Sequence, residues 1–341
     1  MAPAKKKAKV EGIERTPTER RVRPTSRHLR ILSVNVAGLR AVLDPAKNKL
    51  DALVSVVQAE DPDMLCLNEH KLNPGDVDDA KEKLNDAFPE FPVDLMQFAC
   101  CTARKGYSGV AVLRKRDVGS VEEGIRGSKD PIVSSEGRLL TVEFPDLAVI
   151  AAYVPNSGQD LKRLEYRVET WDRSFSAYVA SFAKPVVVVG DLNVARAPMD
   201  IHNMYARPDF RELHEKPLED QYVGLAAVKK QAGLTVEERE SFGRILADSG
   251  VVDTFRHLHP QATGRFTYFS QRAVQNRPKN KGLRLDYVLA SQTMCSADSL
   301  SSSNPKIHDS YILDDAPQIA DHCPVGCDIL LPEEAATQLP S

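Results

Sequence analysis

The feature that most restricts the fold of this chain is the run KPVVVVGDLN at residues 184–193. Four consecutive valines between a proline and a glycine predict a short strand that is buried on both faces of a sheet. Asp191 and Asn193 follow at the end of this strand, where α/β proteins commonly place their reactive side chains. A polar turn that only closes the strand would use the same residues. The interpretation therefore depends on how the other strands of the chain end.

Six further apolar runs have the length and residue types of strands. They lie at residues 29–36, 63–67, 107–113, 138–144, 147–154 and 283–290. Polar residues stand within or just after these runs, the valine run and a last apolar stretch at residues 319–329. They are Asn35, Glu69, Tyr153, Asn156, Asp191, Asn193, Asp286, Asp321 and His322. Because strands that share a sheet edge bring their ends together, we expect these side chains to converge.

Helices are predicted between the strands. Apolar residues recur at helical spacing over residues 46–58 and 161–180, and Thr235 and Glu238 form a capping box before a third helix. Strands and helices therefore alternate in both halves of the chain, and no linker rich in Gly, Ser or Pro separates the halves. This predicts an α/β fold with two sheet-bearing halves packed into one domain over residues 29–331.

Charge is distributed unevenly along the chain. Residues 1–30 hold ten Lys or Arg and three Glu, and the remainder has a net charge of −10. We predict a disordered basic tail over residues 1–28 and a second loose tail over residues 332–341. The stretch AKKKAK at residues 4–9 is typical of a nuclear-import signal or a nucleic-acid-binding arm, although a solvated tail has the same composition. We expect a nuclear protein, with another DNA-containing compartment or the cytoplasm as the alternative.

Composition argues against several other classes of protein. No apolar run approaches the about 18 residues that a membrane span requires, and the N-terminus lacks the apolar core of a secretory signal. The six cysteines form no CxxC pair and are interpreted as thiols of a reduced, intracellular protein. Residues 196–231 are charged and irregular, and they predict a surface insertion that is either a plain loop or a contact for a partner.

The polar residues at the strand ends are suited to metal-assisted hydrolysis of a phosphodiester. Carboxylates are the ligands that Mg²⁺ and Mn²⁺ prefer. A neutral histidine oriented by a carboxylate accepts a proton from water, and amides hold phosphate oxygens. Taken singly, Asp286 is equally a buried acid, His322 a structural histidine and Asn35 a strand-end cap. Taken as an ordered set, the residues favour a catalytic site.

The motifs that carry these residues resemble those of the exonuclease III-type apurinic/apyrimidinic (AP) endonucleases, in order from about residue 29 to residue 330. They are LSVNVAGLRA (32–41), LCLNEHKL (65–72), GYSGVAVL (106–113), EGRLLTVEF (136–144), YVPNSG (153–158), RLEYR (163–167), GDLNVA (190–195), RLDYVLAS (284–291) and DHCPV (321–325). The resemblance implies a four-layered α/β sandwich, with two packed mixed sheets flanked by helices. It implies hydrolysis of duplex DNA 5′ to an abasic site in base excision repair, leaving a 3′-hydroxyl, with 3′-end cleaning or 3′–5′ exonuclease activity.

The resemblance also implies a Mg²⁺ or Mn²⁺ site. Glu69 would be the principal ligand, and Asp321 and Asn35 would complete or support the site. Ala37 departs from the family pattern, because many members carry a carboxylate or Asn at this position. We therefore expect metal binding to depend more heavily on Glu69 and Asp321.

The other catalytic residues are implied to act on water and phosphate. Asp191 and Asn193 would position or activate the attacking water. His322, with Asp286 as its partner, would contact the scissile phosphate or act as the base, and its role remains interchangeable with that of Asp191. Two further side chains would contact the phosphate: Tyr153 and Asn156.

Contacts to DNA are expected from an apolar pocket and from basic loops. By the resemblance, Tyr268, Phe269 and Leu283 take the places of residues that line the abasic pocket, and Leu285 adds to it; such a pocket accepts a flipped sugar that lacks a base. Basic side chains on neighbouring loops would contact phosphates, although each is otherwise a solvated charge. They are Arg40, Arg104, Lys105, Arg272, Arg277 and Lys279. His70 is expected to be a surface residue.

Two alternative functions remain at this point. A phosphodiesterase of the same fold would act on 3′-blocked DNA ends, RNA or a phosphoinositide. A catalytically inactive relative would only bind DNA or a partner, which Ala37 favours and the retained acidic set opposes. We expect a monomer that acts on double-stranded DNA with abasic sites and contacts no membrane.

Overall fold

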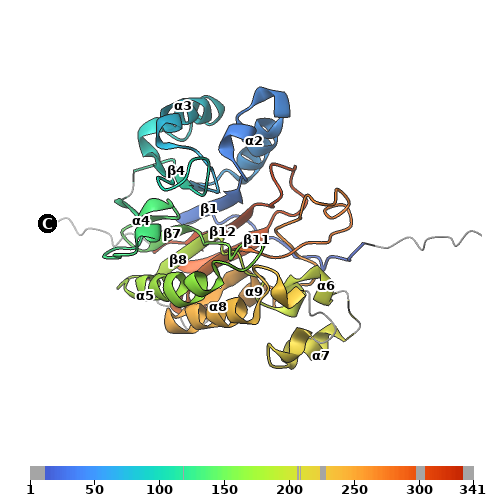
Figure 1. Cartoon of the computed structure of the whole chain (residues 1–341). Coiled ribbons are helices and arrows are strands. Elements are labelled where there is room, and N and C mark those ends of the chain that lie inside the picture. The colour runs from blue at the N-terminus through green and yellow to red at the C-terminus, as the bar shows by residue number, and fades with distance from the viewer. Residues whose placement is uncertain are drawn as a thin grey trace, which may run out of the picture.

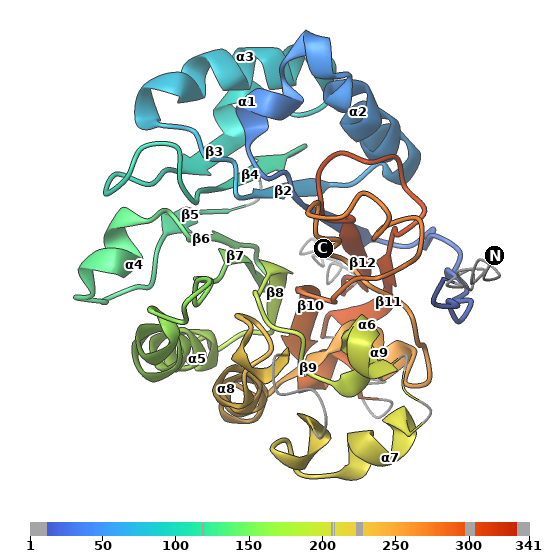
Figure 2. The same cartoon turned by 45° about the vertical axis from the view of Figure 1, so that its right-hand side comes forward.

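Two six-stranded sheets pack against each other, and helices cover the outer face of each sheet (Figure 1). The computed structural model describes residues 12–117, 119–205, 207, 209–222, 228–296 and 304–332. Figure 2 shows α1 (Leu39–Val42), α2 (Lys49–Glu60) and α3 (Val77–Ala87) outside one sheet, and α5 (Asp172–Ala180) and α8 (Val236–Asp248) outside the other. This arrangement confirms the predicted four-layered α/β sandwich. Among the described residues, no helix has the length and apolar character required to cross a membrane.

The first sheet has the strand order β11-β12-β1-β2-β4-β3. Its strands are β1 (His28–Asn35), β2 (Met64–Asn68), β3 (Met96–Ala99), β4 (Val110–Arg114), β11 (Lys306–Ile312) and β12 (Val325–Leu330). Only β1 and β2 run parallel; the other neighbours are antiparallel. The ends of β1 and β2 therefore bring Asn35 and Glu69 to the same edge of the sheet.

The second sheet has the order β5-β6-β7-β8-β10-β9. Its strands are β5 (Val121–Glu123), β6 (Leu139–Glu143), β7 (Ala148–Tyr153), β8 (Val186–Asp191), β9 (Val251–Asp253) and β10 (Asp286–Ser291). Strands β7 and β8 are parallel and align Tyr153 with Asp191, whereas β10 is antiparallel and aligns Asp286 with Asp191. The two sheets thus repeat one design, in which a central parallel pair presents polar side chains at its carboxyl end.

The strands are buried on both faces, which explains their continuous apolar runs. One core contains Ile31 and Cys66 of the first sheet together with Val187 and Val189 of the second, so it fills the space between the sheets. The alternate residues of the same strands pack against the outer helices in two further cores. Trp171 belongs to one of these outer cores, as its helical spacing predicts.

Among the described α-helices, α2, α3, α5 and α8 are longer than six residues. The α-helices are α1 (Leu39–Val42), α2 (Lys49–Glu60), α3 (Val77–Ala87), α4 (Pro131–Ser135), α5 (Asp172–Ala180), α6 (His202–Tyr205), α7 (Phe210–Glu215), α8 (Val236–Asp248) and α9 (Thr254–Leu258). Short 3₁₀ turns are η1 (Pro45–Lys47), η2 (Pro74–Asp76), η3 (Val93–Leu95), η5 (Pro198–Asp200), η6 (Asp220–Tyr222), η7 (Val228–Lys230) and η8 (Gln292–Met294). The helix predicted over residues 161–180 begins instead with a π-helical turn, η4 (Tyr166–Trp171), that leads into α5.

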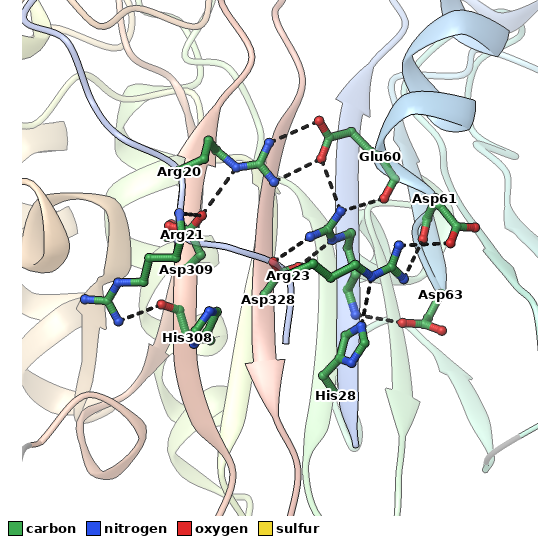
Figure 3. Close-up of polar contacts among 12 residues, drawn as sticks. Arg20, Arg21, Arg23, His28, Glu60, Asp61, Asp63, His308, Asp309 and Asp328 are labelled. Atoms are coloured by element: carbon green, nitrogen blue, oxygen red, sulfur yellow. Dashed lines mark hydrogen bonds and ion pairs between the residues drawn. The ribbon is translucent and has the colours of Figure 1, made fainter. Parts of the chain in front are cut away.

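The N-terminal segment at residues 12–27 lies along the outside of the first sheet, which differs from the disorder expected over residues 1–28. Arg20 pairs with Glu60 at 3.1 Å and with Asp309 at 3.3 Å, and Arg23 pairs with Asp61 at 2.9 Å (Figure 3). The composition of the segment does not reveal that Glu60, Asp61 and Asp309 of the folded domain bind its arginines. Residues 1–11, with the AKKKAK stretch, and nearly all of the predicted C-terminal tail lie outside the described residues.

Arg20→Ala is expected to lower the free energy of unfolding by about 1–2 kcal/mol. The guanidinium of Arg20 makes two hydrogen bonds to Glu60 and lies 3.3 Å from the ring centroid of Tyr311, and Asp309, a second partner, is buried. Urea denaturation followed by circular dichroism measures the change. Arg21→Ala is the matched control, because among the described residues the exposed Arg21 side chain donates only to the carbonyl oxygen of His308. Equal stability of the two variants would contradict the bracing role of Arg20.

Candidate active site

A cavity of about 710 Å³ opens where the carboxyl ends of the central strands of both sheets meet. Nine residues predicted from the sequence to act on substrate or metal line it. They are Glu69, Tyr153, Asn156, Asp191, Asn193, Tyr268, Arg272, Asp321 and His322, and Leu283 and Leu285 of the apolar pocket join them. The predicted convergence of strand ends is therefore present in the structure.

Asp191 lines this cavity and is the last residue of β8. The preceding Gly190 has φ 140°, and a Cβ at this position would lie 2.1 Å from the carbonyl oxygen of Ala152 on β7, so only glycine fits. One oxygen of Asp191 accepts a hydrogen bond from Asn35 Nδ2 at 2.9 Å, and the other accepts one from the backbone N–H of Asn193 at 2.9 Å. Burial and the neighbouring Asp286 carboxylate raise the pKa of Asp191 to about 7.

His322 is held against Asp191 by Asp286. His322 Nδ1 lies 2.7 Å from Asp286 Oδ2, and His322 Nε2 lies 3.9 Å from Asp191 Oδ2. Burial lowers the pKa of His322, but the carboxylates of Asp286 and Asp191 outweigh burial and raise the pKa to about 10. The hydrogen bond to Asp286 fixes the orientation of the imidazole ring, which leaves Nε2 to interact with a group in the cavity.

Two amide side chains form a linked pair on the other side of Asp191. Asn193 Nδ2 donates to the carbonyl oxygen of Val154 at 2.9 Å, and Asn193 Oδ1 accepts from Asn156 Nδ2 at 2.9 Å. Asn156 Oδ1 in turn accepts from the backbone N–H of Gly158. Each amide is therefore oriented by the backbone of a neighbouring loop, and neither rotates independently of the other.

Tyr153 completes this wall of the cavity. Its backbone oxygen accepts a hydrogen bond from Arg138 Nη1 at 3.0 Å, and the Arg138 guanidinium lies 5.0 Å from the ring centroid of Tyr153. Burial and the nearby Glu69 carboxylate raise the pKa of Tyr153 well above its usual value of 10.0. The phenol is therefore protonated at neutral pH and has a hydrogen bond to donate.

The residues implied to hold a metal are placed differently from one another. Glu69 and Asp321 line the cavity, and Glu69 Oε1 lies 2.9 Å from Lys71 Nζ. Asn35 is fully buried and does not line the cavity; its amide oxygen accepts from the backbone N–H of Ala37. The donors at the cavity are mainly carboxylates, which fit a hard divalent cation. Asp191, Asp286 and His322, whose ligand atoms lie within 4.8 Å of one another, form a second group that could hold a metal ion.

The expected DNA contacts are divided between two cavities. Tyr268 packs on His322 with ring centroids 5.0 Å apart, and Leu283 and Leu285 form the apolar wall beside it. Phe269 faces a neighbouring cavity of about 430 Å³ instead, together with Arg277. The basic loop that carries Arg272, Arg277 and Lys279 therefore spans both cavities. Arg40 lies apart, paired with Asp76 at 3.0 Å.

The structure adds five residues to the predicted lining of this cavity: Gln159, Ser270, Lys230, Gln231 and Ala232. Of these, Lys230 and Gln231 belong to the segment at residues 196–231 that was interpreted as a surface insertion, and Ala232 directly follows it. No local pattern marks them, because their position depends on packing of Val228 and Leu234 against Leu283 and Leu285.

His70 differs from its expected place at the surface. It is fully buried, its Nδ1 accepts from the backbone N–H of Leu72 at 3.0 Å, and its Nε2 contacts the carbonyl oxygen of Ala99 at 3.0 Å. The sequence did not reveal this burial, because the neighbouring residues Glu69 and Lys71 are polar. His70 therefore supports the loop that carries Glu69.

Comparison with known proteins gives one consistent result. The Endonuclease/Exonuclease/phosphatase family matches residues 32–322. The chain is 36% identical over 304 residues to the DNA repair nuclease APEX1 of Danio rerio, a match that covers 87% of this chain and 81% of that relative. It is 33% identical over 299 residues to an exodeoxyribonuclease of Bacillus subtilis, covering 87% and 98% of the two chains. The structure is similar to that of the AP endonuclease LMAP from Leishmania major, with a TM-score of 0.70, 29% identity and 93% of each chain covered.

Proposed function

Because this chain belongs to the endonuclease/exonuclease/phosphatase family, we propose that it is a DNA repair nuclease that hydrolyses the phosphodiester 5′ to an abasic site in duplex DNA. The observation that carries the proposal is the composition of one cavity. A hydrolytic group of Asp191, Asn193 and His322 shares that cavity with an apolar wall of Leu283 and Leu285. The product would carry a 3′-hydroxyl, which repair synthesis can extend.

The side chains divide the work of hydrolysis between water and phosphate. Asp191, oriented by Asn35 and by the N–H of Asn193, would hold the attacking water and accept its proton. His322, fixed by Asp286, would donate from Nε2 to a phosphate oxygen as negative charge develops there. The Tyr153 hydroxyl and the Asn156–Asn193 amide pair would hold the remaining phosphate oxygens.

A divalent cation, Mg²⁺ or Mn²⁺, would be held by Glu69 and Asp321, and when bound it supplies Lewis-acid stabilisation of the phosphate. Asn35 would support this site through Asp191 rather than as a ligand, because its amide already bonds Asp191 and Ala37.

Selectivity for an abasic site would come from the apolar wall. Tyr268, Leu283 and Leu285 present apolar surface next to His322, so a deoxyribose without a base would fit there. The loop with Arg272, Arg277 and Lys279 would bind the DNA backbone, and Arg40 would contribute from beside Lys71, whose carbonyl oxygen it binds. Such contacts carry position rather than sequence information and weaken as salt rises.

The proposal also covers the location of the protein, its oligomeric state and the range of its substrates. We propose that the protein acts as a monomer in the nucleus, which the basic stretch at residues 4–9 supports. Trimming of 3′ ends or 3′–5′ exonuclease activity uses the same hydrolytic group, and the relative in Bacillus subtilis is named an exodeoxyribonuclease. The alternative substrates are RNA and a phosphoinositide. The apolar wall offers neither of them a specific contact.

The decisive test is cleavage of a labelled duplex that contains one tetrahydrofuran abasic analogue. With Mg²⁺ we expect a single cut 5′ to the analogue, which is absent with EDTA and on an undamaged duplex. Asp191→Asn is expected to slow this cut by about 10³-fold, because an amide cannot accept the proton of water. Trimming from the 3′ end without the internal cut would move the function to end processing. A folded protein without either activity would overturn the proposal.

A further inference from the structure

A buried ion pair is hydrogen-bonded to the loops that line the cavity, although neither of its two residues lines the cavity itself. Arg167 comes from the π-helical turn η4, and Glu238 comes from the first turn of α8. Their side chains are 1% and 0% exposed, and Arg167 Nη1 lies 3.9 Å from Glu238 Oε1. Burial of two charges costs several kcal/mol unless further hydrogen bonds compensate, so their contacts indicate what the pair holds.

Arg167 Nε donates to Asp172 Oδ1 at 3.2 Å, and its two terminal nitrogens donate to the loops that carry the amide pair of the cavity. Nη1 donates to the carbonyl oxygens of Pro155 at 2.9 Å and Asn193 at 3.1 Å, and Nη2 donates to that of Leu192 at 2.7 Å. These carbonyls belong to Asn193 itself or lie next to Asn193 and Asn156. The π-helical turn is rare in proteins and commonly occurs near functional sites; here it contains the residue that reaches both loops.

Glu238 is hydrogen-bonded to Gly233 on a third loop and to Ser157 on the loop that carries Asn156. Its Oε1 accepts from Ser157 Oγ at 2.5 Å, next to Asn156. Its Oε2 accepts from the backbone N–H of Gly233 at 2.7 Å and from Thr235 Oγ1 at 2.8 Å. The carbonyl oxygen of Gly233 in turn accepts from the backbone N–H of Ala195 at 2.8 Å. The Gly233 turn directly follows Lys230–Ala232, so Glu238 ties this wall of the cavity to the other two loops.

Capping of α8 does not require all of these contacts. A capping box needs only the reciprocal bonds between Thr235 and Glu238, and it contributes about 1 kcal/mol. Asp44, by comparison, caps η1 in the outer layer of the first sheet with one hydrogen bond from the backbone N–H of Ala46. The additional bonds of Glu238 to Ser157 and Gly233, and its burial against Arg167, connect segments more than 70 residues apart along the chain.

We propose that Arg167 and Glu238 are positioning residues for the nuclease reaction. They hold three loops in register, at residues 155–157, 192–193 and 230–233, so that Asn156, Asn193 and the Lys230–Ala232 wall face one phosphate. Neither residue touches the substrate. The inference rests on the proposed function for its kinetic consequence and on the hydrogen bonds alone for its structural consequence.

Kinetics of Glu238 variants test the first consequence. Glu238→Ala is expected to lower kcat on the tetrahydrofuran duplex by about 10²-fold with KM changed less than about threefold, because small displacements of reacting groups are costly. Glu238→Gln is expected to restore kcat to within about threefold of the unmodified protein. A glutamine oxygen still accepts from Gly233 and Thr235, and its amide donates to Ser157 Oγ. Asp44→Ala is the matched control, since it removes the cap of η1 in the outer layer of the other sheet and should leave kcat unchanged.

Hydrogen exchange measured by mass spectrometry tests the second consequence without any activity. Glu238→Ala should accelerate exchange at all three loops by tenfold or more and leave exchange in β8 unchanged. Asp44→Ala should change exchange neither at the three loops nor in β8. If the unmodified protein fails to cleave while exchange rises at the three loops, the proposed function is wrong and the positioning role stands. Unchanged exchange at the loops, or a folded Glu238→Ala protein with full kcat, would overturn the positioning role.

Discussion

His322→Gln is expected to slow single-turnover cleavage of the abasic-site duplex by about 10³-fold. Glutamine keeps polar atoms in the site but cannot supply a charged donor to the phosphate oxygen. It also loses the bond between His322 Nδ1 and Asp286 Oδ2, which measures 2.7 Å. Rapid-quench kinetics at saturating protein measure the rate of the chemical step and separate it from weaker DNA binding.

Asp286→Asn provides an intermediate case for the same mechanism. The amide keeps the shape of the side chain but removes the negative charge that orients and stabilises the imidazole, so a loss of about 10²-fold is expected. His308→Gln is the control, because His308 lies on β11 and contacts the carbonyl oxygen of Val22 far from the cavity. A rate for His322→Gln within tenfold of the unmodified protein would contradict the assigned role of His322.

Asp200→Ala is expected to lower the free energy of unfolding by about 3–5 kcal/mol, because it removes one of the two carboxylates that compensate the buried guanidinium of Arg284. Asp200 is fully buried, and its carboxylate accepts from Arg284 Nε at 2.8 Å and from Arg256 Nη2 at 2.9 Å. Arg284 also pairs with Asp253 at 2.6 Å. Chemical denaturation measures the loss, and Asp209→Ala serves as the control because the ion pair of Asp209 with Arg207 is more exposed.

The same carboxylate predicts how stability depends on pH. The two guanidinium groups hold the pKa of Asp200 well below its usual value of 3.8. In the unfolded chain an aspartate binds its proton near pH 4, whereas folded Asp200 does not. Its contribution is therefore complete above about pH 4 and is lost as pH falls further. The difference in stability between Asp200→Ala and the unmodified protein should shrink in that acidic range; a constant difference would show that the carboxylate is not specifically paired.

The identity of the chemistry was readable from short stretches of sequence. The valine run before Asp191 predicts a buried strand because continuous β-branched residues fit a sheet covered on both faces. The residues after such strands gather at one edge, which explains why Glu69, Tyr153 and His322 could be assigned to one site. Both layers of sheet follow from the same local patterns, repeated in each half of the chain.

The supports of the site could not be predicted in this way. The pairs Arg20–Asp309 and Arg284–Asp200 join residues 289 and 84 positions apart, and nothing in either local sequence names its partner. The segment at residues 12–27 therefore resembled a disordered tail, and Lys230 resembled part of a plain loop. His70 was expected at the surface but is buried, because both of its ring nitrogens form hydrogen bonds with backbone groups inside the protein.

The sequence by itself determined the elements, their alternation and the set of reactive side chains, because periodicity and turn chemistry are properties of a few neighbouring residues. Only the tertiary structure decided how these side chains are oriented. The side chain of Asn35 donates to Asp191 and does not line the cavity, and Phe269 lines a neighbouring cavity. Glu238 is hydrogen-bonded to Ser157 and Gly233 on two different loops. Orientation depends on hydrogen bonds and packing between distant segments, and those contacts exist only once the two sheets have come together.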